Sequence, residues 1–321
     1  MLRTAPRQLP KEPRAQSLWR IVRKSLRQDW QLYLLLLLPI AFVIIFRYAA
    51  YPGLRIAFMN FKPARGFAGS EWVGWGTFQK IFRDADFHRA LQNSLVFNFL
   101  DLLVGFPVPI ILAILLNELR FRRFKKISQT VLYLPHFLSW VIIASVAYSL
   151  FKPDSGLINI LLKSAGVIET GIPFLTDKWH WAGTYLLMGV WQTMGWGSII
   201  YLAAITGIDM ELYEAVTVDG AGRLRKIWHI TLPGIRATIV TLLILNLGRV
   251  MNSNFERLSA FGNVNVRDFQ YQLAIYIFEK GLGASNFSNA TAVGLFQSAV
   301  GFLLVLTADR CAKMLGESGL I

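Results

Sequence analysis

The residues best suited to a specific task lie in a polar segment, residues 209–233, between two long apolar runs. Asp209 is suited to begin a helix there, because its carboxylate can accept hydrogen bonds from the free backbone N–H groups of the first turn. Glu214 follows within the same expected helix, and the acidic residues near its start favour the positive end of the helix dipole. A second short helix is expected over residues 223–230, with Pro233 at the start of the next apolar run.

Apolar side chains on the first of these helices indicate what the segment would do. Leu212, Tyr213 and Val216 would project as an apolar patch from a polar loop, and an exposed patch of this kind calls for a partner. Gly220 and Gly222 permit a backbone reversal that a side chain would hinder. The pattern therefore predicts a helix-turn-helix that docks onto another protein.

Six apolar segments elsewhere in the chain are long enough to cross a membrane, which takes about 20 helical residues. They predict an all-α, polytopic membrane protein with about six transmembrane helices. The expected spans cover residues 31–50, 91–116, 130–151, 181–208, 235–251 and 290–306.

The composition agrees with a membrane protein and argues against several other classes. Of the 321 residues only 16% are charged, below the roughly 25% usual for soluble domains. The net charge of +14 does not indicate nucleic-acid binding, because most basic residues flank apolar spans and no basic-aromatic module occurs. Cys311 is the one cysteine, which rules out an intrachain disulfide, and the histidines lack metal-ligand spacing.

Basic residues also predict the orientation of the chain. They are concentrated before the first span, between spans two and three, and between spans four and five, which places these regions in the cytoplasm. The loop between spans one and two is expected outside yet is net positive, which conflicts with the charge rule. Long loops cross largely regardless of charge, but this one has only about 40 residues, so the conflict is softened and not removed. We therefore expect a cytoplasmic basic N-terminal segment (1–28), a transmembrane domain (29–315) with a cytoplasmic loop at 209–233, and a cytoplasmic tail (316–321), so that both termini lie in the cytoplasm.

The outer loop between spans three and four is expected to form a helix of its own. Asp154 or Ser155 could cap it and Gly166 could end it, with an apolar stripe from Leu157 to Ala165 between them. Two interpretations stay open: a helix that lies in the membrane interface, and a docking surface for an external partner.

The order of residues in the polar segment resembles a known family motif. Glu214-Ala215, then Gly220, then Ile230-x-Leu232-Pro233 is similar to the EAA loop of bacterial ABC import permeases, with Val216 in place of the second alanine. Further stretches resemble the carbohydrate branch of these permeases that handles oligo- and polysaccharides, including alginate importers. They are residues 30–39, 156–159, 286–298 and 316–321.

This resemblance implies a type I ABC importer permease fold and a set of partners. Such importers combine two related permease chains, here a heterodimer, with two ABC ATPase subunits and an external or periplasmic solute-binding protein. ATP and Mg would bind to the ATPase, since this chain has no Gly-x4-Gly-Lys-Ser/Thr loop, and neither a cofactor nor a catalytic residue is expected here. The residues implied in ATPase coupling are Leu212, Tyr213, Glu214, Ala215, Val216, Asp219, Gly220 and Pro233.

Polar residues in or just beyond the spans are candidates for the saccharide pathway, because polar groups there usually face a cavity or a partner. Asn246 and Arg249 are three residues apart and would share a helix face. Arg249 contacts an anionic sugar such as a uronate, pairs with a buried acid, or extends to the membrane interface from near the end of span five. Asp101 and His136 either contact substrate or make structural hydrogen bonds. The main candidates are His136, Trp191, Gln192, Asn246, Arg249 and Asn252, with Asp101, Trp196 and Asn254 as further ones.

Other functions remain as alternatives. The coupling motif is shared across substrate classes, so a permease for peptides or another polar solute is open. An uncoupled channel would not need the docking segment, and a membrane enzyme would need clustered acids or a His/Asp motif, neither of which stands out.

Overall fold

The computed structural model describes residue 26 and residues 28–317, 319 and 320. The predicted basic segment 1–28 therefore lies almost wholly outside the described residues, as do Ser318 and Ile321 of the predicted tail. The chain forms two compact units, Met1–Arg55 and Ile56–Ile321.

The described part of the first unit is helical from Trp30 onward. Helix α2 (Trp30–Val43) has no buried residue and continues into the π-helix η1 (Ile44–Tyr48). The 3-10 helix η2 (Tyr51–Phe58) follows, so the helical stretch extends beyond the expected end at residue 50. A long apolar helix without a buried face calls for lipid or another protein around it.

Among the described residues, three helical stretches are long and apolar enough to cross a membrane, or up to five if each of two bent pairs counts as one span. The three are Trp30–Phe58, Ala85–Glu118 and Phe287–Met314. The bent pairs are Arg122–Phe137 with Trp140–Phe151, at 107°, and Arg223–Gly234 with Arg236–Leu247, at 60°.

The expected fourth span corresponds to α9 (Lys178–Thr206), a helix of 29 residues that is not among these candidates. Its tryptophans, glycines and Gln192 lower its hydropathy. Helix α9 packs against α4 (Ala85–Gly105), α5 (Pro107–Glu118) and α6 (Arg122–Tyr133). A helix enclosed by others can carry small and polar residues that a lipid-facing helix cannot.

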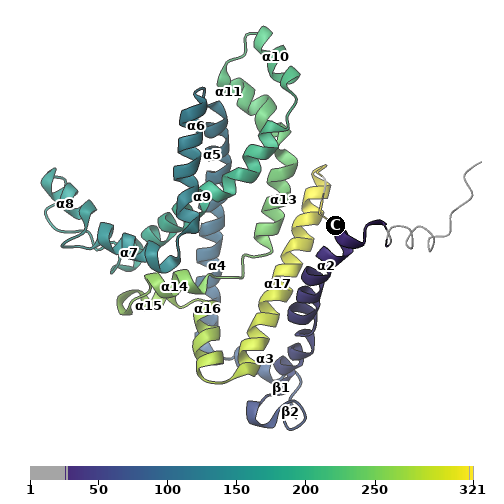
Figure 1. Ribbon diagram of the computed structural model, residues 1–321. Helices are drawn as coiled ribbons and strands as arrows, with labels where there is room; N and C mark the ends of the chain where they lie inside the picture. The colour runs from purple at the N-terminus through teal and green to yellow at the C-terminus, as the bar shows by residue number, and fades with distance from the viewer. Residues whose placement is uncertain (1–25, 27, 318, 321) are drawn as a thin grey trace, which may run out of the picture. The chain divides into compact units, whose positions relative to one another are not determined.

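The second unit has a short hairpin at one end and the polar segment 209–233 at the other (Figure 1). Strand β1 (Met59–Asn60) pairs antiparallel with β2 (Glu71–Trp72), and α3 (Gly76–Ile81) follows. The Ser288 hydroxyl donates to the Met59 carbonyl at 2.6 Å and accepts from the Phe61 amide at 2.9 Å. The hairpin is thereby fixed to the start of α17 (Phe287–Met314).

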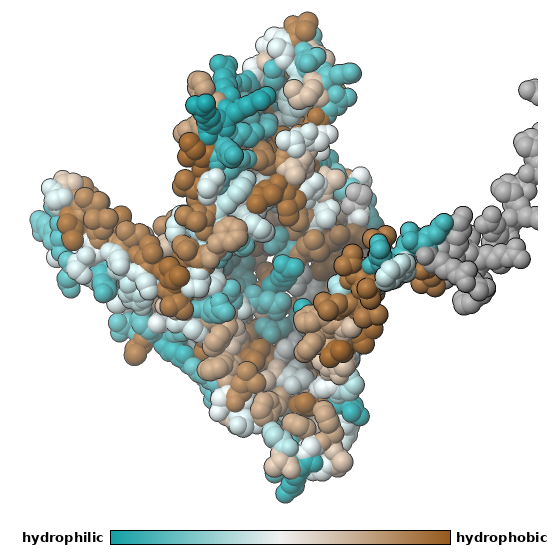
Figure 2. Space-filling view, in the orientation of Figure 1, coloured by the Kyte–Doolittle hydropathy of each residue, from teal (hydrophilic) through white to brown (hydrophobic). Residues whose placement is uncertain are grey.

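The chain bends by 107° after the helical stretch Arg122–Phe137, which contains α6. Beyond the bend, α7 (Trp140–Phe151) and α8 (Leu157–Ser164) form an arm (Figure 1). The helix predicted between spans three and four is thus confirmed, although its N-cap is Gly156 rather than Asp154 or Ser155. Gly166 follows the helix with a left-handed φ of 69°. Hydrophobic residues gather along this arm (Figure 2).

The remaining elements connect these parts. Most of them belong to the polar segment 209–233 or to the stretch between α13 and α17. They are η3 (Pro63–Arg65), η4 (Leu134–Phe137), α10 (Met210–Val218), α11 (Arg223–Lys226), η5 (Ile227–Thr231), α12 (Leu232–Gly234), α13 (Arg236–Leu247), α14 (Phe255–Phe261), η6 (Val264–Val266), α15 (Arg267–Gln270), α16 (Leu273–Tyr276) and η7 (Ile277–Gly283).

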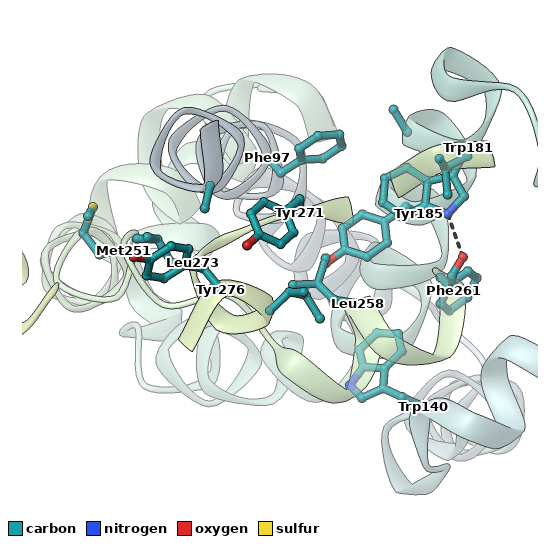
Figure 3. Close-up of a cluster of buried hydrophobic side chains, with 14 of the residues drawn as sticks. Phe97, Trp140, Trp181, Tyr185, Met251, Leu258, Phe261, Tyr271, Leu273 and Tyr276 are labelled. Atoms are coloured by element: carbon teal, nitrogen blue, oxygen red, sulfur yellow. Dashed lines mark hydrogen bonds between the residues drawn. The ribbon is translucent and has the colours of Figure 1, made fainter. Parts of the chain in front are cut away.

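The largest core cluster joins α4, α7, α9, α14 and α16 (Figure 3). Trp181 and Tyr185 stack with centroids 4.9 Å apart, and Phe97 meets both rings edge-on. The Trp181 indole N–H donates to the Phe261 carbonyl at 2.9 Å. Stacked and edge-on aromatic rings, with the Trp181 indole N–H satisfied, therefore form the part of this core between α4, α9 and α14.

An ion-pair network on the surface ties α4, α9 and α15 together. The Asp268 carboxylate pairs with Lys178 and with Arg89, and the Asn93 amide donates to the Tyr271 carbonyl at 2.9 Å. These cations hold the pKa of the Asp268 carboxyl below its usual range, and Lys178 has the larger effect.

Gly195 allows α9 to approach α6 at backbone distance, because a Cβ at this position would lie 1.9 Å from the Leu132 carbonyl oxygen. We predict that Gly195→Ala destabilises the chain by about 1–3 kcal/mol through overpacking. Gly183→Ala in the same helix is the matched control, since a Cβ there meets nothing within 4 Å. Thermal unfolding in detergent would measure both; equal unfolding temperatures for the two variants would contradict the prediction.

Candidate functional site

The first predicted helix of the polar segment is present as α10. Asp209 is its N-cap, and its carboxylate accepts from the Glu211 amide at 3.0 Å, as expected. Glu214, Ala215 and Asp219 lie on its exposed surface or at its end. Figure 1 shows α10 at the extreme end of the second unit, away from the main body.

The turn after α10 depends on one glycine. Gly220 has a φ of 77°, in the left-handed region that a side chain disfavours. The Ala221 amide then donates back to the Val216 carbonyl at 3.1 Å, which closes the end of the helix. Gly222 was expected to share this role, but its φ of −71° suits any residue, and it serves instead as the N-cap of α11.

Two side-chain hydrogen bonds fix α10 to the helical stretch that follows it. The Tyr213 hydroxyl lies 2.9 Å from the Thr231 hydroxyl. The Lys226 ammonium donates to the Thr217 hydroxyl at 2.6 Å. Because of these bonds, α10 and the stretch 223–234 are held to each other as one piece.

The exposed apolar patch differs from the predicted one. Leu212 is exposed as expected, but Tyr213 and Val216 are half-buried, because they face the following helical stretch. Sequence reasoning missed residues with greater exposure, including Val218 at 89% and Trp228 at 67%. Their signal was available: apolar residues in a segment otherwise rich in charge. The full exposed apolar set is Met210, Leu212, Val218, Leu224 and Trp228.

Pro233 was predicted to start the fifth span, and this prediction is wrong. It lies inside α12, and Ile235 separates it from α13, which begins at Arg236. The chain bends by 60° between the two helices. A cleft of about 380 Å³ beside Pro233 is lined by Leu212, Ala215 and Val216, among others.

The pathway candidates fall into separate places, and one of them lines a cavity. Asn252 borders a cavity of about 430 Å³ together with Ser253 and Gln297. Phe255 and Phe278, with ring centroids 4.8 Å apart, form an apolar part of its wall. Amide groups beside aromatic rings can bind a sugar through its hydroxyls and its C–H faces.

Asn246 and Arg249 do not share a helix face, because α13 ends at Leu247 and Arg249 lies in the turn beyond it. The Asn246 amide donates to the Leu242 carbonyl at 2.7 Å. Arg249 is exposed, and among the described residues it has no ion-pair partner. Of the two structural alternatives for Arg249, pairing with a buried acid is therefore not observed among the described residues, while an exposed position is also compatible with a side chain that extends to the membrane interface.

His136 and Trp196 lie together, apart from that cavity. Their rings stack with centroids 4.6 Å apart and an interplanar angle of 7°. Nδ1 of His136 is buried and has no hydrogen-bond partner within the described chain. Gln192 is buried, and Trp191 packs against the main core, so these two residues do not line the same cavity as Asn252.

Asp101 has a structural partner that the sequence did not reveal. Arg257, only 6% exposed, places Nη1 2.6 Å from the Asp101 carboxylate. Its guanidinium also lies 3.7 Å above the Tyr185 ring. Gly189 makes room for it, since a Cβ there would lie 2.1 Å from Nη2. Arg257 and Asp101 are 156 positions apart, so no local sequence pattern could predict their pairing. The sequence indicated only that an acid inside an apolar span needs a counter-charge.

Asn254 has a capping role: its side chain accepts from the Arg257 amide at 2.9 Å. Within the part of the chain that the structure describes, no three His, Cys, Asp or Glu side chains are grouped to hold a metal ion.

A family model described as "binding-protein-dependent transport system inner membrane component" matches residues 105–310. The chain is 44% identical over 301 residues to the polygalacturonan/rhamnogalacturonan transport system permease protein YteP of Bacillus subtilis, covering 94% of this chain and 93% of that protein. It is 42% identical over 296 residues to the protein LplB of the same organism, covering 92% of each chain.

Two solved structures are also similar. One is a bacterial ABC transporter involved in the import of the acidic polysaccharide alginate, with a TM-score of 0.80 and 35% identity over 92% of this chain and 99% of that chain. The other is a bacterial alginate ABC transporter in complex with an alginate pentasaccharide-bound periplasmic protein, with a TM-score of 0.81 and 35% identity over 95% and 100%. The predicted ABC importer permease fold is confirmed.

We predict that Asp101→Ala destabilises the chain by about 3–5 kcal/mol, because it leaves the buried Arg257 cation unpaired. Adding Arg257→Leu should recover part of that loss, giving a non-additive double-mutant cycle. Unfolding in detergent measures each variant. Asp86→Ala, which breaks a half-exposed pair with Lys280, is the control and should cost at most about 1 kcal/mol. Additive effects of Asp101→Ala and Arg257→Leu would contradict the assignment.

Proposed function

Because the chain belongs to the family of binding-protein-dependent transport system inner membrane components, we propose that it is a permease subunit of an ABC importer for an acidic oligo- or polysaccharide. The observation that carries the substrate class is its similarity over most of its length to a polygalacturonan/rhamnogalacturonan permease and to an alginate transporter. Polygalacturonan and alginate are both chains of uronate sugars, so a carboxylate on each ring would be the shared feature.

The segment at α10 would couple transport to ATP hydrolysis on a separate ATPase subunit. It projects from the second unit, it is fixed to the helical stretch behind it, and it exposes an apolar patch that includes Leu212 and Trp228. Coupling by such a surface is a population shift: the ATPase would bind one permease conformation better than the other. ATP and Mg would be bound by that ATPase.

The other partners and the orientation follow from this assignment. The chain would pair with a second, related permease and receive the saccharide from an external or periplasmic solute-binding protein. The basic loops support an orientation in which α10 and both termini would lie in the cytoplasm. The hairpin of β1 and β2, at the opposite end of the second unit (Figure 1), would then lie on the outer side.

Two neighbouring features would contact the saccharide. The cavity beside Asn252 offers amide groups and the Phe255 and Phe278 rings. Arg249, three residues before Asn252, supplies an exposed cation without an ion-pair partner in the described residues. A guanidinium suits carboxylate recognition because it can donate two parallel hydrogen bonds.

Reversing the charge of Glu214 tests the coupling role. We expect Glu214→Lys, or Gly220→Pro, to leave the chain inserted but to abolish transport driven by ATP hydrolysis, because α10 no longer fits the ATPase. Uptake and ATP hydrolysis by the reconstituted transporter are the measurements. Glu169→Lys makes the same charge change on an exposed residue of the loop between α8 and α9. This variant should transport normally. Normal coupling in both α10 variants would refute the role.

Removing the charge of Arg249 tests the substrate class. We expect Arg249→Gln to raise KM for a uronate oligosaccharide roughly tenfold, the effect of losing about 1.4 kcal/mol of charge-assisted binding. Arg249→Lys should retain part of the affinity. Arg310→Gln removes another exposed arginine and serves as the control. An unchanged KM in Arg249→Gln would exclude Arg249 from the pathway.

A further inference from the structure

Helices α13 and α17 lie side by side, and at one point their backbones touch. A Cβ on Gly301 would lie 2.4 Å from the Gly248 carbonyl oxygen. No side chain could fit between the helices there, so the contact between Gly248 and Gly301 fixes their distance at that level. Contacts of this kind between small residues hold membrane helices close together.

From that contact toward Arg236 and Glu317, the two helices border an apolar groove of about 390 Å³. Apolar groups alone do not fix the spacing of the helices along a groove, because side chains there have room to shift. The groove is lined by Val240, Leu243, Leu247, Leu304, Cys311 and Leu315.

An ion pair bridges the far end of this groove. Arg236 Nε lies 2.5 Å from Glu317 Oε1. The Glu317 side chain is 14% exposed and that of Arg236 is 58% exposed. The pair is thus covered on one side and connects the first residue of α13 to the tail that follows α17.

The tail itself is folded back onto α17, so Glu317 is held in place. Gly316 has a φ of 81°, which allows the chain to reverse. The Glu317 amide donates to the Ala312 carbonyl at 3.0 Å. The Leu320 amide donates to the buried Asp309 carboxylate at 2.5 Å.

Arg236 lies directly beyond the 60° bend that separates α13 from the helical stretch 223–234, which follows α10. Ile235, at the bend, is fully buried. On the other side of the bend, the Tyr213–Thr231 contact fixes α10 to that stretch. A displacement of α10 would therefore reach Arg236 through one short helical segment.

We propose that the Arg236–Glu317 pair is a positioning pair that transmits movement of α10 to α17. Through this pair, α13 and α17 move together about the Gly248–Gly301 contact instead of separating along the groove. The inference rests on the proposed coupling role of α10. The Arg236 side of the pair is open to solvent, at 58% exposure, and ion pairs that solvent reaches contribute little to folding stability; loss of this pair would therefore impair coupling more than folding.

The test uses the assembled transporter with its ATPase, reconstituted in liposomes. Arg236→Glu and Glu317→Arg should each lower the saccharide transported per ATP hydrolysed at least threefold, with the unfolding temperature and ATPase co-purification retained. The double variant, which restores the pair with its charges exchanged, should return within twofold of the original ratio. Glu317→Gln should change the ratio in the same direction as Glu317→Arg.

The matched control is Arg267–Glu279, a pair of the same types at the same 2.5 Å distance but on another part of the surface. Its single variants should leave the ratio unchanged. An unchanged ratio in folded Arg236→Glu and Glu317→Arg, or no recovery in the double variant, would overturn the inference. If Glu214→Lys still uncouples in that case, only the positioning pair is refuted; if Glu214→Lys is also silent, the coupling role of α10 falls as well.

Discussion

The buried guanidinium of Arg257 is the charge on which the main core depends. It pairs with Asp101 of α4, donates to the Tyr185 carbonyl of α9 and lies over the Tyr185 ring. Its ring contacts extend to Trp140 of α7. Because a buried charge without a partner is costly, these elements cannot separate from α14 independently. The aromatic cluster and the small Gly189 are arranged around it.

The opposite end of the second unit is built in a different way. Helix α10 has no buried residue and is held by two hydrogen bonds to the stretch that follows it. Between this end and the Arg257 core lie a bend at Ile235, α13, and the Gly248–Gly301 contact. A core held by a buried charge and joined to a projecting helix through a bent segment suits the proposed role, in which movement at one side of a membrane is converted into opening at the other.

The sequence was informative wherever a local pattern determines local structure. Asp209, α10 and the left-handed Gly220 follow from capping and backbone preferences, and the apolar runs follow from hydropathy. Features that depend on distant contacts were not predictable: Arg257 as partner of Asp101, the half-burial of Tyr213, and the end of α13 before Arg249. The hydropathy of α9 is too low for it to count among the candidate spans, because it carries polar residues such as Gln192 and Ser198. Neighbouring helices bury these residues.

The most direct test of the account is to purify the tagged chain from native membranes in mild detergent and to identify its companions by mass spectrometry. The account predicts a second, related permease and an ABC ATPase in the same complex. It also predicts that Leu212→Asp with Trp228→Asp, which replaces the apolar patch by charge, removes the ATPase and retains the second permease. An intact, folded chain that purifies without any ATPase would contradict the docking role of α10.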